Sequence, residues 1–192
     1  MTFSRLLKDI RACTHCARHI PCTPRPVLQA SPSALLRIIG QAPGRKVHET
    51  GIPWNDRSGE RLRQWLGITP EVFYDAQRVA LVPMGFCYPG SAASGDNPPR
   101  PECAPRWHVP LNKHLSNVKL TLLIGQYAQA YYLKDNKKTL TETVTRWRDY
   151  LSHGFLPLPH PSPRNVAWFK KNKWFEKELV PELRSEIDKL GL

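Results

Sequence analysis

Short apolar runs separated by longer polar stretches predict that strands alternate with helices along this chain. Four runs have the length and composition of buried strands, at 35–41, 78–83, 120–125 and 155–159. Helical spacing of apolar residues predicts helices at 59–67, 106–115, 126–133, 139–150, 168–179 and 181–190. In the last of these, Leu183, Ile187 and Leu190 form one stripe behind a proline in the first turn.

This alternation predicts an α/β fold of three layers, α/β/α, with a central, mainly parallel four-stranded sheet. Right-handed crossovers bring the carboxyl ends of parallel strands to one edge, where such folds bind ligands. The Pro- and Gly-rich segments after the strands are therefore expected to meet at one cleft; they are 41–44, 84–87, 125–126 and 160–165. Without a repeat or a linker, residues 1–192 are expected to form a single domain.

The charge of the chain points to a polyanionic partner. There are 28 Lys and Arg residues against 16 Asp and Glu, which gives a net charge of +12. Nucleic acid is the first candidate partner, and a basic surface that serves only solubility is the alternative. The start of the chain lacks the apolar core of a secretory signal, and no run of about 18 apolar residues is present to span a membrane. We therefore expect a cytoplasmic protein without a membrane partner.

Four cysteines have a spacing that suits a metal centre. Cys13 and Cys16 form a C-x2-C pair, and Cys87 and Cys103 lie in Pro- and Gly-rich surroundings far along the chain. Four converging thiolates hold either a tetrahedral zinc or an iron–sulfur cluster. The long separations favour the cluster, but spacing alone leaves zinc open. Disulfides are disfavoured in a reducing cytosol, and the polar segment around the first pair is unlike a core; Cys22 has no assigned role.

A strand ending in GQAPG, this cysteine set and a late strand ending in HPSPRN together resemble the uracil-DNA glycosylase superfamily. The resemblance is closest to its iron–sulfur branches, types 4 and 5, and runs from Cys13 to about Asn165. The order of the motifs is much more specific than any one of them. It implies that Cys13, Cys16, Cys87 and Cys103 hold a [4Fe-4S] cluster. It also implies a DNA N-glycosylase of base excision repair that hydrolyses the glycosidic bond of uracil and other deaminated bases.

Such an enzyme needs a group that donates to the leaving base, a stacking surface and a group that positions water. His160 is the predicted donor, and Trp54 occupies the position of the family's stacking aromatic; the alternatives are a structural histidine and a core tryptophan. Ser162 and Arg164 are expected to contact DNA, Arg164 at a phosphate. The other predicted substrate-binding residues are Gly40, Ala42 and Asn55.

The catalytic carboxylate departs from the type 4 pattern. Type 4 members carry Glu where this chain has Gln41, and Asn where it has Pro83; Gln41 cannot act as a base but can orient water or the base. Type 5 members carry Asp in a GDxSG stretch, which the sequence NDRSG at 55–59 matches from Asp56 onward. We therefore predict Asp56 as the catalytic carboxylate, together with His160 and Gln41.

Asp and Ser are both common helix caps, so the competing interpretation of Asp56 is a cap for the helix that follows. Ser58 is the predicted cap, which leaves Asp56 free for catalysis. Glu49 and Asp96 are lesser candidates for the carboxylate.

These departures leave two functions open. The first is the glycosylase, expected to act on DNA as a monomer, nucleoid-associated in a bacterial-type cytoplasm. The second is a catalytically weak or inactive nucleic-acid-binding protein with the same fold and cluster. In either case, the basic tract is expected to give salt-dependent binding; it consists of Arg164, Lys170, Lys171 and Lys173.

Overall fold

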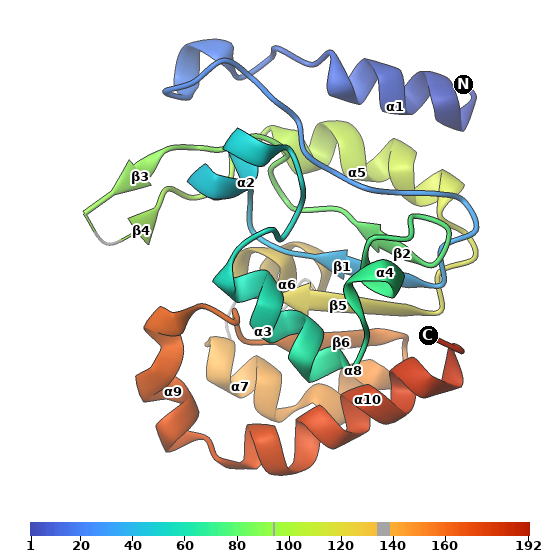
Figure 1. Ribbon diagram of the computed structural model, residues 1–192, viewed down its shortest axis with the longest axis vertical. Coiled ribbons are helices and arrows are strands. Elements are labelled where there is room, and N and C mark those ends of the chain that lie inside the picture. The colour runs from blue at the N-terminus through green and yellow to red at the C-terminus, as the bar shows by residue number, and fades with distance from the viewer. Residues whose placement is uncertain (94, 134–138) are drawn as a thin grey trace.

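The computed structural model describes residues 1–93, 95–133 and 139–192. Its centre is a four-stranded parallel sheet in the order β2-β1-β5-β6 (Figure 1). The strands are β1 (Leu36–Ile39), β2 (Val79–Leu81), β5 (Leu120–Ile124) and β6 (Phe155–Leu158). Leu36 pairs with Val79 on one side and with Leu120 on the other. The expected fold class is confirmed, since all four strands run in parallel and helices flank them.

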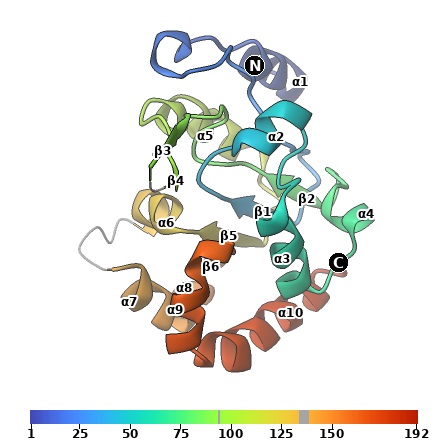
Figure 2. The same cartoon turned by 60° about the vertical axis from the view of Figure 1, so that its left-hand side comes forward.

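Helices cover both faces of the sheet (Figures 1 and 2). One face carries α3 (Arg57–Leu66), α7 (Leu140–Thr145), α8 (Trp147–Leu151) and α10 (Val180–Lys189). The other carries α5 (Cys103–His114) and α6 (Gln126–Leu133), with α1 (Phe3–Arg11) packed on the outer side of α5. This arrangement follows from strand geometry, because alternate side chains point to opposite faces. Leu36 and Ile38 enter the core with α3 and α10, whereas Ile39 packs toward α6.

Several helix boundaries differ from the predicted ones. The helix predicted at 139–150 is divided at Arg146 into α7 and α8. The helix predicted at 168–179 is divided into α9 (Val166–Lys171) and a π-helical turn, η3 (Phe175–Leu179). Asn172 ends α9 because its side-chain amide donates to the carbonyl of Trp168 at 2.9 Å. No helix within 1–93, 95–133 and 139–192 has the length and apolar character needed to cross a membrane.

The remaining elements are short and were not predicted. They are the helices α2 (Arg45–Thr50) and α4 (Pro70–Phe73), the 3-10 turns η1 (Ala17–His19) and η2 (Pro163–Asn165), and a hairpin of β3 (Ser91–Ala92) and β4 (Gly95–Asp96). The hairpin projects from the body of the molecule on the side of α2 (Figure 1). It lies in the chain between Cys87 and Cys103.

Candidate active site and cysteine cavity

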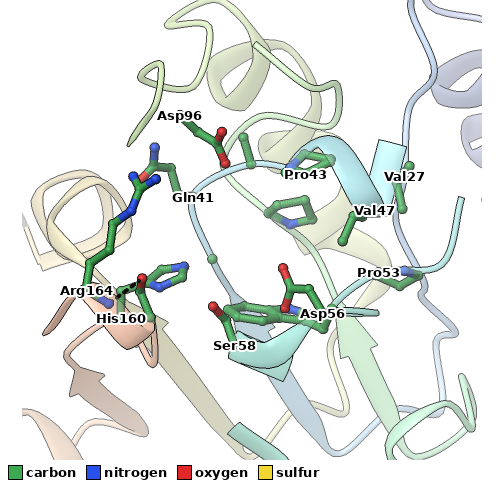
Figure 3. Close-up of a pocket in the computed structure, with 16 residues that line it drawn as sticks. Val27, Gln41, Pro43, Val47, Pro53, Asp56, Ser58, Asp96, His160 and Arg164 are labelled. Carbon is green, nitrogen blue, oxygen red and sulfur yellow. Dashed lines mark hydrogen bonds between the residues drawn. The ribbon is translucent and has the colours of Figure 1, made fainter. Parts of the chain in front are cut away.

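A pocket of about 260 Å³ opens beyond the carboxyl ends of β1, β2 and β6 (Figure 3). This is the place expected for a ligand site in a parallel sheet. Of the residues predicted for catalysis and substrate binding, only Asn55 does not line it. Those that do are Gly40, Gln41, Ala42, Trp54, Asp56, His160, Ser162 and Arg164. The loop after β1, the turn before α3 and the loop after β6 therefore meet, as the strand order requires.

Trp54 forms one wall of the pocket in a strained backbone conformation. Its φ angle is +57°, a region that bulky residues rarely adopt. Two glycines make room for it. A Cβ on Gly40 would lie 2.7 Å from Cζ2 of the indole, and a Cβ on Gly59 would lie 1.8 Å from the Trp54 carbonyl oxygen. The indole stacks against the ring of His160, with 5.7 Å between ring centroids and 28° between planes.

Asp56, not Ser58, caps α3, and the prediction about the cap was wrong. Oδ1 of Asp56 accepts a hydrogen bond from the backbone N–H of Gly59 at 2.8 Å. Ser58 already lies inside the helix, which begins at Arg57. The carboxylate nevertheless points into the pocket (Figure 3). The competing interpretation of Asp56 as a helix cap is therefore confirmed, and its catalytic role stays a prediction.

Hydrogen bonds within its loop hold the backbone around His160, which lies near both pocket carboxylates. The side-chain amide of Asn165 donates to the His160 carbonyl at 2.7 Å, and Ser162 Oγ accepts from the N–H of Arg164 at 3.2 Å. Burial lowers the pKa of His160, and the carboxylates of Asp56 and Asp96 raise it only in part. The imidazole is therefore neutral at neutral pH, with one N–H to donate.

The β3–β4 hairpin closes one rim of the pocket. Nε2 of Gln41 donates to the carbonyl of Asn97 at 3.1 Å, which ties the loop after β1 to the hairpin. Arg164 lies against the backbone of Gly95, where a Cβ would come within 2.1 Å of Nη1. Asp96, a lesser candidate from the sequence, lines the pocket, whereas Glu49 does not.

The four cysteines predicted to hold a metal group line one small cavity of about 20 Å³. Cys13 and Cys16 come from the segment after α1, Cys87 from the loop after β2, and Cys103 from the first turn of α5. None of the four forms a disulfide. Burial raises the pKa of Cys87 to about 11 and that of Cys103 to about 12. Such thiols become thiolates only when a bound cation compensates for the lost hydration.

Hydrogen-bond donors accompany these sulfurs. The backbone N–H of Phe86 donates to Sγ of Cys103 at 3.4 Å, and the guanidinium of Arg100 lies beside Cys16. Within the described ranges, no three His, Cys, Asp or Glu side chains converge to hold a single metal ion. Cys22 lies outside this cavity and lines another one with Arg45 and Tyr88.

The segment from Pro83 to Cys87 is a wall shared by the pocket and the cysteine cavity. Pro83 lines the pocket, and Phe86 and Cys87 line the cysteine cavity. Between them, the N–H of Met84 donates to the Gly40 carbonyl at 2.9 Å, and that of Gly85 to the Gln41 carbonyl at 3.0 Å. A displacement of this segment in the cysteine cavity would therefore also move the pocket wall.

His108 on α5 supports this shared wall, a role that the sequence did not reveal. It is fully buried, its Nε2 lies 3.0 Å from the Pro83 carbonyl, and its Nδ1 lies 2.7 Å from the Tyr132 hydroxyl. Because a carbonyl only accepts, Nε2 carries the proton and Nδ1 accepts from Tyr132. The ring also stacks on Phe86 at 5.7 Å. Burial lowers the pKa of His108 to about 4, so the ring is neutral.

Comparison with known families agrees with this geometry. The model of a family described as the uracil DNA glycosylase superfamily matches residues 29–184. The match includes the whole sheet, Cys87, Cys103 and the pocket residues other than Val27, and it begins after Cys13 and Cys16. On this match over most of its length, the chain belongs to the uracil DNA glycosylase superfamily.

Proposed function

We propose that the protein is a DNA glycosylase that hydrolyses the N-glycosidic bond of uracil in DNA, as a step of base excision repair. Membership of the superfamily supports a glycosylase-type hydrolase in general. The observation that supports the finer proposal is the meeting of Asp56, His160 and Trp54 in one pocket. It joins a carboxylate, a neutral hydrogen-bond donor and an aromatic face. Other deaminated bases are further substrates under the same proposal.

Each of the three groups has a distinct part in this reaction. A base in a duplex must first be rotated out of the stack, and Trp54 offers it an aromatic face. The bond between sugar carbon and base nitrogen then breaks, and both electrons leave with the base. The N–H of neutral His160 donates to the base oxygen on which negative charge develops. The free oxygen of Asp56 faces the positive charge on the sugar, orients the attacking water and accepts its proton.

The neutral state of His160 is consistent with its burial. An imidazolium in this wall would have to be desolvated, which is why the pKa is lowered. A neutral ring still donates one hydrogen bond to the oxyanion. Its stack on Trp54, at 5.7 Å between centroids, fixes the ring relative to the surface that receives the base. The donor is thus oriented before the substrate arrives, and little reorganisation is required during the reaction.

For the cysteines, we propose a [4Fe-4S] cluster with a structural role. The four cysteines line one cavity, and Sγ of Cys103 accepts a backbone hydrogen bond of the kind found around such clusters. Zinc, the alternative, takes four sulfurs at about 2.3 Å from one ion, and metal analysis of the purified protein distinguishes it from the cluster. When bound, the cluster cross-links the segment after α1 to the shared wall and to α5. A brown protein with iron and sulfide in equal amounts would support it, whereas a colourless protein with stoichiometric zinc would refute it.

DNA is the proposed partner, and the basic tract, which begins at the pocket with Arg164, is its proposed contact. Arg164, Lys170, Lys171 and Lys173 are exposed on and just after the loop that carries His160. Lysine contacts to phosphate release counterions, so each one lost lowers the salt slope of binding by roughly 0.9. Reversing the three lysines to Glu should therefore lower both the affinity and the slope. If both stay unchanged, the tract is only a solvated surface.

An excision assay tests the enzymatic proposal. Oligonucleotides with a single uracil, in single- and double-stranded form, are incubated with the protein and then cleaved at abasic sites with alkali. Cleavage in the wild-type protein that is lost in both Asp56→Asn and His160→Ala supports the proposal and its residues. Tight binding without cleavage of any deaminated base favours the inactive binding protein instead. The departures from the type 4 pattern at Gln41 and Pro83 are the reason for testing that alternative.

A further inference from the structure

The hairpin brings a second carboxylate to the pocket. Asp96, at the end of β4, lies on the wall opposite Asp56, and both side chains point toward the space between them (Figure 3). It comes from the segment between Cys87 and Cys103 and belongs to none of the four segments that follow the strands of the sheet. In the mechanism above, Asp56 acts at the sugar and His160 donates to the base oxygen. Asp96 has no role in that mechanism.

Asp96 is held in place by a relay of hydrogen bonds. Ser91, its partner across the hairpin, donates from Oγ to Oδ1 at 2.9 Å. Because that proton is committed to Asp96, the Tyr88 hydroxyl, 2.6 Å from Ser91 Oγ, must be the donor to it. Tyr88 is buried, with only 3% of its surface exposed, and its oxygen lies beside the guanidinium of Arg45. An exposed hairpin carboxylate is thereby anchored to a buried side chain.

This relay engages Oδ1 and leaves Oδ2 for the pocket. Oδ2 lies over Gly44 in the pocket wall, where a Cβ would come within 3.2 Å of it. Pro83 has no polar side chain, and Nε2 of Gln41 already donates to Asn97. Oδ2 of Asp96 is thus an oriented group that only accepts hydrogen bonds.

Such an acceptor distinguishes bases by one ring proton. Uracil and hypoxanthine carry an N–H in the six-membered ring, next to the carbonyl that deamination introduces. Cytosine and adenine carry a lone pair on the corresponding nitrogen, which a carboxylate repels. We infer that Asp96 is a specificity-determining residue that accepts the ring N–H of a flipped lactam base and rejects the amino bases. Thymine has the same N–H, so Asp96 does not discriminate against it.

This inference rests on the proposed function, because it assigns the base that the same pocket takes. It also separates the roles of the two carboxylates. The hydrogen bond to the ring N–H is present in the bound substrate and does not strengthen as negative charge builds on the leaving base. Asp96 therefore contributes to binding and selection, whereas Asp56 contributes to the chemical step.

Kinetics of base excision provide the first test. Asp96→Ala should raise KM for uracil-containing DNA roughly 10- to 100-fold, the loss expected for one hydrogen bond to a charged group, while kcat stays within a few-fold. Asp96→Asn places an amide donor beside the lone pair of cytosine. In this variant, the kcat/KM for uracil divided by the kcat/KM for cytosine should fall by a similar factor. Asp188→Asn, which removes an exposed carboxylate on α10, is the matched control for charge. Unchanged KM and base ratio in both Asp96 variants would overturn the inference.

A binding measurement separates this inference from the activity. Equilibrium dialysis compares free uracil with 3-methyluracil, in which a methyl group replaces the ring proton. Wild-type protein should bind uracil at least about 10-fold more tightly, and Asp96→Ala should bind both alike. If no base is excised but this difference is found, the proposed function fails and the role of Asp96 stands. If the wild-type protein binds both bases equally, the role of Asp96 fails, whatever the activity.

Discussion

The pocket and the cysteine cavity share a wall, yet they are built in opposite ways. The pocket has about 260 Å³ of space and a polar lining in which Asp56 and Asp96 each hold one oxygen in a fixed hydrogen bond. The cysteine cavity has about 20 Å³, and Pro24, Pro26 and Trp107 help to enclose its sulfurs. An open site with oriented groups suits a ligand that comes and goes. Closely packed thiols that lose hydration on burial suit a group that stays bound.

The largest effect is expected at Asp56. Asp56→Asn keeps an oxygen that can cap α3 through the N–H of Gly59, but it removes the negative charge beside the sugar. We expect kcat to fall by about 10²- to 10⁴-fold while the free energy of unfolding hardly changes. Asp56→Ala should lose a similar factor in kcat and also about 1 kcal/mol of stability. Single-turnover excision and urea denaturation measure the two quantities.

Comparing Asp56→Asn with Asp56→Ala separates a catalytic role of Asp56 from a role in capping α3. If Asp56→Asn retains the wild-type rate and Asp56→Ala is merely less stable, then Asp56 is only a helix cap. In that event the catalytic role would have to pass to Asp96, the other oriented carboxylate of the pocket.

The next effect concerns the cysteine cavity. Cys103→Ser should lose the bound group and lower the free energy of unfolding by about 2–5 kcal/mol, as the loss of other cross-links between distant segments does. Cys22→Ser is the matched control, since Cys22 lines a different cavity and should leave both properties unchanged. Iron and sulfide analysis and denaturation in the absence of oxygen provide the measurements. Equal behaviour of the two variants would contradict the assignment of the ligands.

His108 connects the two regions and should give a stability that depends on pH. Its pKa is about 4 in the folded protein and about 6.5 in the unfolded chain. Between these values the unfolded chain binds a proton that the folded protein does not. Stability therefore falls as the pH is lowered from about 6.5 to 4, by roughly 3 kcal/mol in all.

Urea denaturation between pH 7 and pH 4 should show this loss in the wild-type protein beyond the loss in His108→Gln. The glutamine can still donate to the Pro83 carbonyl but takes up no proton. The comparison with the variant removes the contribution of other titrating groups, among them His160, whose pKa is also lowered. The same dependence on pH in both proteins would show that His108 is not the group responsible.

The sheet and much of the pocket could be predicted from the sequence because both follow from local rules. Buried parallel strands appear as apolar runs, and right-handed crossovers place their ends at one edge. Gln41 and His160 were therefore expected at one site, and both line it. Trp54 and Asp56 were expected there from a resemblance of motifs, which periodicity alone does not supply.

What could not be predicted depends on contacts between distant segments or on very short elements. The two-residue strands of the hairpin are too short to show a period, so Asp96 was only a lesser candidate for the catalytic carboxylate. His108 looks like one polar residue on a helix, and only the packing of α5 against the wall buries it. The capping role of Asp56 depends on where α3 begins, and helix boundaries are uncertain by a residue or two in any sequence pattern.

The smallest expected effects come from two glycines, one for each region. Gly40→Ala places a methyl group 2.7 Å from the indole of Trp54, whereas Gly85→Ala places one 3.0 Å from Cβ of Pro99. Overpacking of this kind costs roughly 1–3 kcal/mol. In Gly40→Ala the indole must shift, so KM for uracil-containing DNA should rise about 10-fold with the metal content intact.

Gly85→Ala should have the opposite profile, with less bound iron and a KM close to that of the wild-type protein. Its new methyl group presses on the segment that leads to Cys103, and the nearest atoms are those of Pro99 and Arg100. If each variant impaired both KM and iron content, the shared wall would be transmitting strain in both directions through Met84 and Gly85. The two regions would then be one mechanical unit, and the bound group would influence base recognition through the backbone of Gly40 and Gln41.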